Sequence, residues 1–79
     1  MTTSNTFNPA TVSITAAGMV TWTNNAGIDH NVTFNQATGA PANVANFSTG
    51  SASRSFPTAG TFAYQCTLHA GMNGTVVVQ

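Results

Sequence analysis

The stretch from Tyr64 to Met72 contains the residues whose types and spacing could bind a metal. It reads Tyr-Gln-Cys-Thr-Leu-His-Ala-Gly-Met and includes the only cysteine of the chain, Cys66, with His69 three residues later and Met72 three residues after that. A thiolate, an imidazole and a thioether together form a soft ligand set that suits copper. The other histidine, His30, lies far upstream, so we expect the fold to bring it to this stretch from a second loop.

The spacing of Cys66 and His69 requires a turn. In a β-strand, residues three apart point to opposite faces of the sheet. Both side chains can reach one ion only if the chain leaves the strand at Cys66 and bends back. Gly71 and Asn73-Gly74 provide backbone flexibility around Met72 that such a bend needs.

Each of these residues also has a simpler interpretation. A lone cysteine is often an inert buried thiol, a lone histidine is often an ordinary core or surface residue, and Met72 could serve core packing alone. The regular spacing of the three residues favours metal ligation over these interpretations. Asp29 beside His30 resembles an acid–histidine pair, but no motif places a serine as nucleophile, which argues against a hydrolase.

Length and charge exclude several classes of function. The chain has 79 residues, and a domain of this size buries only about 60% of the surface that its unfolded chain exposes. One cysteine cannot form an internal disulfide, so a metal is the available way to stabilise a small core. With one cation (Arg54) and one anion (Asp29), the chain lacks the basic clusters needed to bind nucleic acid or anionic membranes.

No apolar run approaches the roughly 20 residues of a membrane span, and the polar start, Met-Thr-Thr-Ser-Asn-Thr, does not resemble a signal peptide. The abundance of Thr, Asn, Ala, Gly and Ser is similar to that of secreted bacterial surface modules. We therefore expect a periplasmic or extracellular protein whose signal peptide or parent chain lies outside this sequence, and we expect no direct insertion into a membrane.

Short alternating stretches separated by turn residues predict an all-β fold. Strands are predicted at 11–15, 19–23, 30–34, 53–56, 61–65 and 74–79. Residues 35–46 lack a clear period and are predicted to form a long loop, and no stretch has a helical apolar stripe. We expect one domain over residues 1–79, a β-sandwich or barrel of about seven to eight strands. Val20 and Trp22 should face the core, His30, Val32 and Phe34 should share a face, and Met19 should be a core residue.

Several stretches together resemble the small blue-copper proteins (cupredoxins) of the plastocyanin, pseudoazurin and amicyanin group. These are Phe-Asn-Pro at 7–9, Val-Thr-Trp-Thr-Asn at 20–24, His-Asn-Val-Thr-Phe at 30–34, Gly-Thr-Phe-Ala-Tyr-Gln-Cys at 60–66, Cys-Thr-Leu-His-Ala-Gly-Met at 66–72 and Gly-Thr-Val-Val-Val at 74–78. The two-residue gap on each side of His69 is most similar to the short ligand loop of amicyanins. The resemblance implies a Greek-key β-sandwich with one mononuclear type 1 copper near one end.

The resemblance also implies a role for individual residues. His30, Cys66 and His69 would be the strong equatorial ligands and Met72 the long axial ligand. The backbone N–H of Asn31 would donate to the Cys66 sulfur, and the Asn31 side chain would tether the ligand loop at Thr67. The His69 ring edge would lie at the surface among three apolar residues, Leu68, Ala70 and Pro41.

Two positions depart from the pattern of many relatives. Asp29 stands where proline often precedes the first histidine, and Leu68 stands where proline often follows the threonine after the cysteine. We expect these changes to affect the rigidity of the loop, and so its reduction potential, but not copper binding itself.

The function that the resemblance implies is one-electron transfer, with copper cycling between Cu(II) and Cu(I) and electrons passing through the exposed edge of His69. We expect a monomeric carrier, not an enzyme, that docks redox partner proteins on the apolar surface around His69. Two alternatives remain open at this point. The chain could be a copper-binding module for storage, delivery or sensing, or a structural β-sandwich domain of a larger surface protein.

Overall fold

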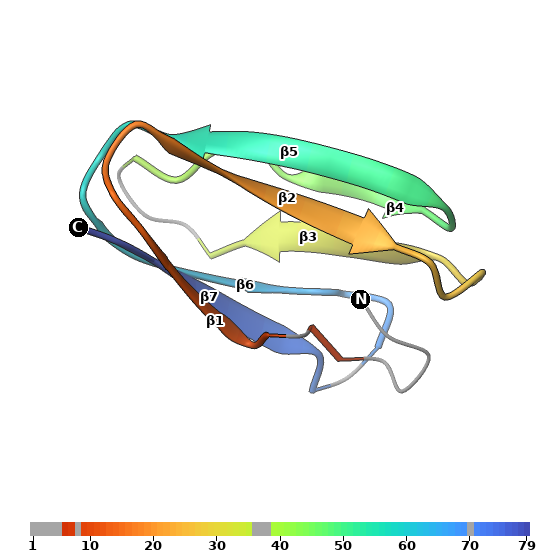
Figure 1. The fold of residues 1–79 in the computed structure, drawn as a ribbon. Coiled ribbons are helices and arrows are strands. Elements are labelled where there is room, and N and C mark those ends of the chain that lie inside the picture. The colour runs from red at the N-terminus through yellow and green to blue at the C-terminus, as the bar shows by residue number, and fades with distance from the viewer. Residues whose placement is uncertain (1–5, 8, 36–38, 70) are drawn as a thin grey trace.

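The computed structural model describes residues 6–7, 9–35, 39–69 and 71–79, and all regular structure within them is β-strand. The strands, shown in Figure 1, are β1 (Thr11–Ile14), β2 (Gly18–Asn24), β3 (His30–Phe34), β4 (Val44–Phe47), β5 (Gly50–Phe56), β6 (Gly60–Gln65) and β7 (Asn73–Val78). Among these residues, no helix is long and apolar enough to cross a membrane.

The strands form two sheets that face each other (Figure 1). One sheet has five strands in the order β1-β7-β6-β3-β4, and the other pairs β2 with β5. β1 runs parallel to β7, whereas all other neighbours are antiparallel. The predicted β-sandwich of seven to eight strands is therefore confirmed.

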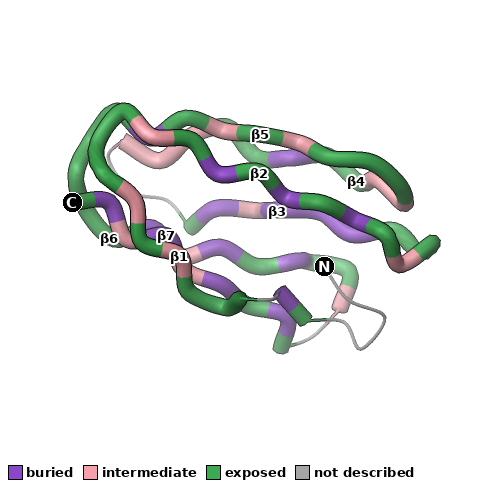
Figure 2. Tube along the Cα trace, in the orientation of Figure 1, coloured by how far each residue is buried: buried purple, intermediate pink, exposed green. Residues whose placement is uncertain are grey.

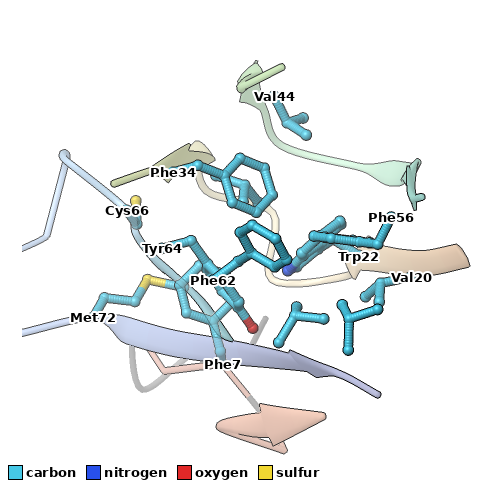
Figure 3. Packing of buried hydrophobic residues seen from close by; sticks show 13 residues of the cluster. Phe7, Val20, Trp22, Phe34, Val44, Phe56, Phe62, Tyr64, Cys66 and Met72 are labelled. Carbon is cyan, nitrogen blue, oxygen red and sulfur yellow. The ribbon is translucent and has the colours of Figure 1, made fainter. Parts of the chain in front are cut away.

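The core between the sheets is aromatic. Trp22 meets Phe34 and Tyr64 edge-on, with ring centroids 5.8 and 5.4 Å apart, and Phe56 packs against Phe34 at 6.0 Å (Figure 3). Such edge-to-face pairs stabilise a core beyond the area they bury. Burial raises the pKa of Tyr64 above its usual value of 10.0, so the hydroxyl stays protonated at neutral pH. Figure 2 shows buried and exposed residues alternating along β2.

The predicted long loop at 35–46 is partly wrong, because strand β4 begins at Val44. Val44 is buried and pairs with Val32, but the other residues of β4 are exposed or half-buried, so the segment shows no apolar alternation. Its position depends on Arg54, which donates hydrogen bonds to the carbonyls of Ala42 and Asn43 at 2.9 Å each. A tertiary contact, not a local pattern, places this strand. Residues 36–38 of the predicted loop lie outside the described part of the chain.

Two further predictions need correction. β5 begins at Gly50 instead of residue 53, because its first half pairs with the far end of β2, from Asn24 to Trp22. Met19 is not a core residue, since its side chain is 64% exposed. Strand alternation already directs Val20 and Trp22 inward, which leaves Met19 on the outer face. The predicted strands at 11–15, 19–23, 30–34, 61–65 and 74–79 match observed strands to within one residue at each end.

Candidate metal centre

The predicted ligands meet at one end of the sandwich. His30 is the first residue of β3, Cys66 follows the last residue of β6, and Met72 precedes the first residue of β7. One potential ligand atom from each of His30, Cys66 and His69 lies within 4.8 Å of the other two. His30, Cys66 and Met72 are almost completely buried, whereas His69 is half-buried.

The chain between β6 and β7 forms the tight turn that the spacing requires. The backbone N–H of Cys66 donates to the Met72 carbonyl at 2.9 Å, and that of Met72 donates to the His69 carbonyl at 3.3 Å. Gly71 adopts φ 79°, a left-handed conformation that glycine takes without steric cost. These bonds close the loop directly beyond the last β6–β7 pair, Gln65 with Asn73. Figure 3 shows Cys66 and Met72 at the same end of the core.

Asn31 connects β3 to the ligand loop through three hydrogen bonds. Its backbone N–H points at the Cys66 sulfur at 3.4 Å. Its side-chain Nδ2 donates to Thr67 Oγ1 at 2.9 Å, and its Oδ1 accepts from the Thr67 N–H at 3.1 Å. These are the contacts expected of Asn31 and Thr67 from the sequence. They hold Thr67, and so the start of the loop, in register with β3.

Two other residues complete the hydrogen bonding of the Asn31 amide. The second Nδ2 hydrogen is donated to Asn46 Oδ1 at 3.0 Å, and Thr33 Oγ1 donates to Asn31 Oδ1 at 3.2 Å. The amide therefore uses both donors and both acceptor positions, which fixes its orientation. Sequence reasoning missed Asn46 because it lies in the strand that was predicted as loop.

Asn31 faces this network from the outward side of β3, the side that it shares with Thr33. The β3–β4 register shifts between His30 and Val32, which is the signature of a β-bulge or a similar irregularity. Two steps along β3 oppose three along β4, so the extra residue lies in β4. Asn31 is buried on the outward side of β3 because it contacts Asn46 and Thr67 there. Bulges are frequent beside functional sites because they redirect one side chain.

The main chain of Asp29 contacts the exposed side of the site. The His69 Nε2 atom lies 3.2 Å from the Asp29 carbonyl oxygen. A carbonyl can only accept a hydrogen bond, so this contact assigns the proton to Nε2 and leaves the Nδ1 lone pair available for a metal. Histidine ligands are commonly oriented in this way by a carbonyl at the second ring nitrogen. No sequence signal pointed to this role, because it belongs to the backbone.

Asn24 holds the loop that leads to His30. It is completely buried, and its Nδ2 donates to the carbonyls of Ile28 at 3.0 Å and Phe47 at 2.6 Å, while its Oδ1 accepts from the Ala26 N–H at 3.0 Å. Phe47 is the pairing partner of His30. One amide thus ties the entry to β3 to the strand beside it. The sequence did not predict this role, because it depends on contacts with a distant strand.

The surface beside His69 is apolar. Leu68 is 45% exposed, and Ile28, next to Asp29, is 41% exposed. Of the other residues expected there, Pro41 is half-buried and Ala70 lies outside the described residues. Ile28 was not predicted, because only the contact between Asp29 and His69 brings its loop to this surface.

The donor set fits copper. Two imidazoles, one thiolate and one thioether in a mostly buried pocket are the ligands of blue-copper sites. The buried thiol and the methionine favour a soft ion over the hard, oxygen-binding cations.

Comparison with known proteins also points to copper binding. Residues 2–79 match the family model described as copper binding proteins of the plastocyanin/azurin family. The chain is 43% identical over 84 residues to a plastocyanin of Scenedesmus fuscus, with 92% of this chain and 86% of the relative covered. It is 38% identical over 76 residues to amicyanin-alpha of Methylorubrum extorquens, with 92% of this chain and 64% of the relative covered.

The fold supports this relationship. The structure superimposes on oxidised plastocyanin from Dryopteris crassirhizoma with a TM-score of 0.83 at 28% identity, covering 94% of this chain and 88% of the other. Copper is thus the cofactor, and the His, Cys, His and Met side chains at one site are a suitable ligand set for a single ion. The chain belongs to the plastocyanin/azurin family of copper binding proteins.

Proposed function

We propose that this protein is a type 1 copper electron carrier that exchanges electrons through the edge of His69. The observation that carries the proposal is the graded burial of the site. His30 and Cys66 are 0% and 2% exposed, whereas His69, within 4.8 Å of both, is half-exposed. A buried redox centre with one ligand at the surface suits electron transfer to another protein.

Each candidate ligand has a distinct role in the proposal. His30, Cys66 and His69 hold the ion strongly, and Met72 is the weak axial ligand. When bound, the copper supplies one-electron chemistry between Cu(II) and Cu(I), and this mixed donor set suits both states. The hydrogen bonds within the ligand loop and from Asn31 keep the donors in place during the change of oxidation state. This rigidity limits the reorganisation that each electron transfer requires.

Asn31 also tunes the site in this proposal. Its N–H at 3.4 Å from the Cys66 sulfur withdraws electron density from the thiolate. That withdrawal stabilises the reduced state and raises the reduction potential, as hydrogen bonds to metal ligands generally do.

The partners are redox proteins that dock on the apolar surface beside His69, with this chain acting as a monomer. Leu68 and Ile28 supply exposed apolar area there. We place the protein outside the cytoplasm, in the periplasm or beyond. Nothing in this role requires a bound substrate, so the proposed protein is a carrier and not an enzyme.

Optical spectroscopy of the copper-loaded protein tests the proposal. Adding Cu(II) should produce the intense visible band of Cys-to-Cu(II) charge transfer, and Cys66→Ser should abolish it while leaving the far-ultraviolet circular dichroism unchanged. A colourless Cu(II) complex of the folded protein would contradict a type 1 site. Voltammetry should show fast, reversible one-electron exchange. Slow exchange, with ready transfer of copper to a chelator, would indicate storage or delivery instead.

A further inference from the structure

The two charges of this chain have very different surroundings. Arg54 is half-buried, and its guanidinium donates to three backbone carbonyls, those of Ala42, Asn43 and Ser53, at 2.8 to 2.9 Å. Asp29 is exposed, and no ion pair joins its carboxylate to another described residue. The arginine is committed to holding the chain between β3 and β4, whereas the carboxylate is available to a partner.

Asp29 lies at the edge of the proposed docking surface. Its carbonyl oxygen contacts His69 Nε2 at 3.2 Å, its neighbour Ile28 is exposed, and Leu68 adjoins His69. We call these four residues, Ile28, Asp29, Leu68 and His69, the His69 surface. It combines apolar area, one redox-active ring edge and one negative charge.

Arg54 does not compensate this charge. The distance between the two charges can be judged along β2. Arg54 pairs with Val20 near one end of that strand. Asn24, four residues further along, holds the loop before Asp29 through a hydrogen bond to the Ile28 carbonyl. Four residues of strand span about 13 Å, which exceeds the Debye length of about 8 Å at physiological ionic strength. Bound copper together with the Cys66 thiolate would add a net charge of +1 in the oxidised state and none in the reduced state. At the surface itself, the exposed Asp29 carboxylate is the negative side chain that a docking partner would meet.

We propose that the His69 surface selects a redox partner whose contact area is apolar and carries a lysine or arginine opposite Asp29. This proposal rests on the proposed electron-transfer function. Apolar contact supplies most of the binding, and the single charge orients the partner and disfavours acidic ones, because rim charges act mainly on association rate and specificity. A charge at this position has unusual weight, since the chain has no other Asp or Glu.

The first test compares two small reductants of opposite charge, hexaammineruthenium(II) and hexacyanoferrate(II), reacting with the oxidised copper protein in a stopped-flow instrument. The readout is the ratio of the two rate constants, cation over anion. A change in reduction potential moves both rates in the same direction, so the ratio isolates the charge effect. In Asp29→Asn this ratio should fall several-fold at about 150 mM ionic strength, where the Debye length of about 8 Å screens the more distant charges, and the difference should nearly vanish at about 1 M.

A matched control moves the charge without changing the net charge. Ser55 is exposed on the outer face of β5. It is five residues, or about 16 Å of strand, from Gly50, which pairs with Asn24 at the end of the sheet near Asp29. The double variant Asp29→Asn with Ser55→Asp should behave like Asp29→Asn alone. If the double variant restores the wild-type ratio, the net charge of the protein and not the position of the carboxylate determines the ratio of the two rate constants, and the proposal is wrong.

The second test imitates the partner with gold electrodes coated by methyl-terminated monolayers that contain a minority of ammonium or carboxylate groups. The wild-type protein should exchange electrons several-fold faster on the methyl–ammonium surface than on the methyl–carboxylate surface. Asp29→Asn should remove that difference, and Leu68→Ser should slow exchange on both surfaces.

The outcomes separate this proposal from the function on which it rests. Absence of the visible band, or no exchange with either reductant, would contradict the electron-transfer function itself. Exchange with both reductants at the same ratio in wild type and Asp29→Asn would leave that function intact and overturn the assignment of a cationic partner.

Discussion

Strands β2 and β3 lie in opposite sheets and follow different rules. In β2, burial alternates strictly from Val20 to Asn24, and the outward residues Thr21 and Thr23 pair their hydroxyls with Ser53 and Ser51 across the strand at 2.8 and 3.0 Å. In β3, the first three residues are all buried, and two of them, His30 and Asn31, are polar. β2 therefore behaves as a regular strand with one solvent-exposed face and one buried face.

The departure in β3 coincides with the candidate copper site. Asn31 is buried because Thr67 of the ligand loop and Asn46 of β4 contact its side chain, and its amide is fully hydrogen-bonded. A buried amide is tolerated only when its donors and acceptors are satisfied. We infer that the aromatic core between the sheets supplies most of the stability. The hydrogen-bonded region around Asn31 mainly maintains the geometry of the candidate ligands. The following predictions test that division.

The largest expected effect comes from the aromatic core. Phe56 is 0% exposed and packs against Trp22, Phe34 and Phe62. Phe56→Ala should lower the free energy of unfolding by about 3–5 kcal/mol, in apo and copper-loaded protein alike. Met19→Ala is the control, since that side chain is 64% exposed and its loss should change stability by less than about 0.5 kcal/mol. Urea unfolding followed by circular dichroism measures both, and equal effects would contradict the observed core.

Copper removal should have the next largest effect. The ion binds the folded site and stabilises it by mass action, by about 2.7 kcal/mol when free metal is about 100-fold above Kd. Calorimetry should show a lower melting temperature for the apoprotein. Identical melting of the two forms would show that this small core does not depend on the metal for stability.

Asn31→Ala should have a smaller effect on stability and a specific effect on the copper site. Loss of the side-chain bonds to Thr67 and Asn46 should cost about 1–3 kcal/mol. Because the loop would be held less firmly, the reduction potential and the visible band should also shift. Thr21→Val on the outer face of β2 removes one exposed hydroxyl bond and should alter neither property of the copper site. An Asn31→Ala protein with an unchanged potential would show that the network stabilises the fold only.

The smallest effect is expected at the turn before β2. Ala17 adopts φ 69°, a left-handed conformation, in a turn closed by the Gly18 N–H and the Thr15 carbonyl at 2.9 Å. Glycine relieves the steric cost of that conformation but has more unfolded-state entropy to lose. Ala17→Gly should therefore stabilise the protein by at most about 1 kcal/mol and leave the visible spectrum unchanged. A clear loss of stability would mean that the turn is not strained.

The sequence by itself was enough to propose the candidate ligand set and to predict most of the strands. Cys66, His69 and Met72 are close in the chain, so their spacing reports directly on the loop that holds them, and His30 followed as the remaining histidine. The strands from Met19 to Thr23 and from Thr61 to Gln65 could be predicted because alternation is a local consequence of strand geometry.

Only the tertiary structure decided which groups other than Asn31 and Thr67 support the site. β4 has almost no apolar alternation and is placed by Arg54 and by pairing with β3, so Asn46 could not be assigned to the Asn31 amide in advance. The contact of His69 with Asp29 uses a backbone carbonyl, a group that every residue has and that no residue type signals. Hydrogen bonds between segments depend on register and on bulges, which arise from the packing of distant strands. That is why the sequence could suggest the candidate metal donors and the tether between Asn31 and Thr67, but not the contributions of Asn46 and of the Asp29 carbonyl.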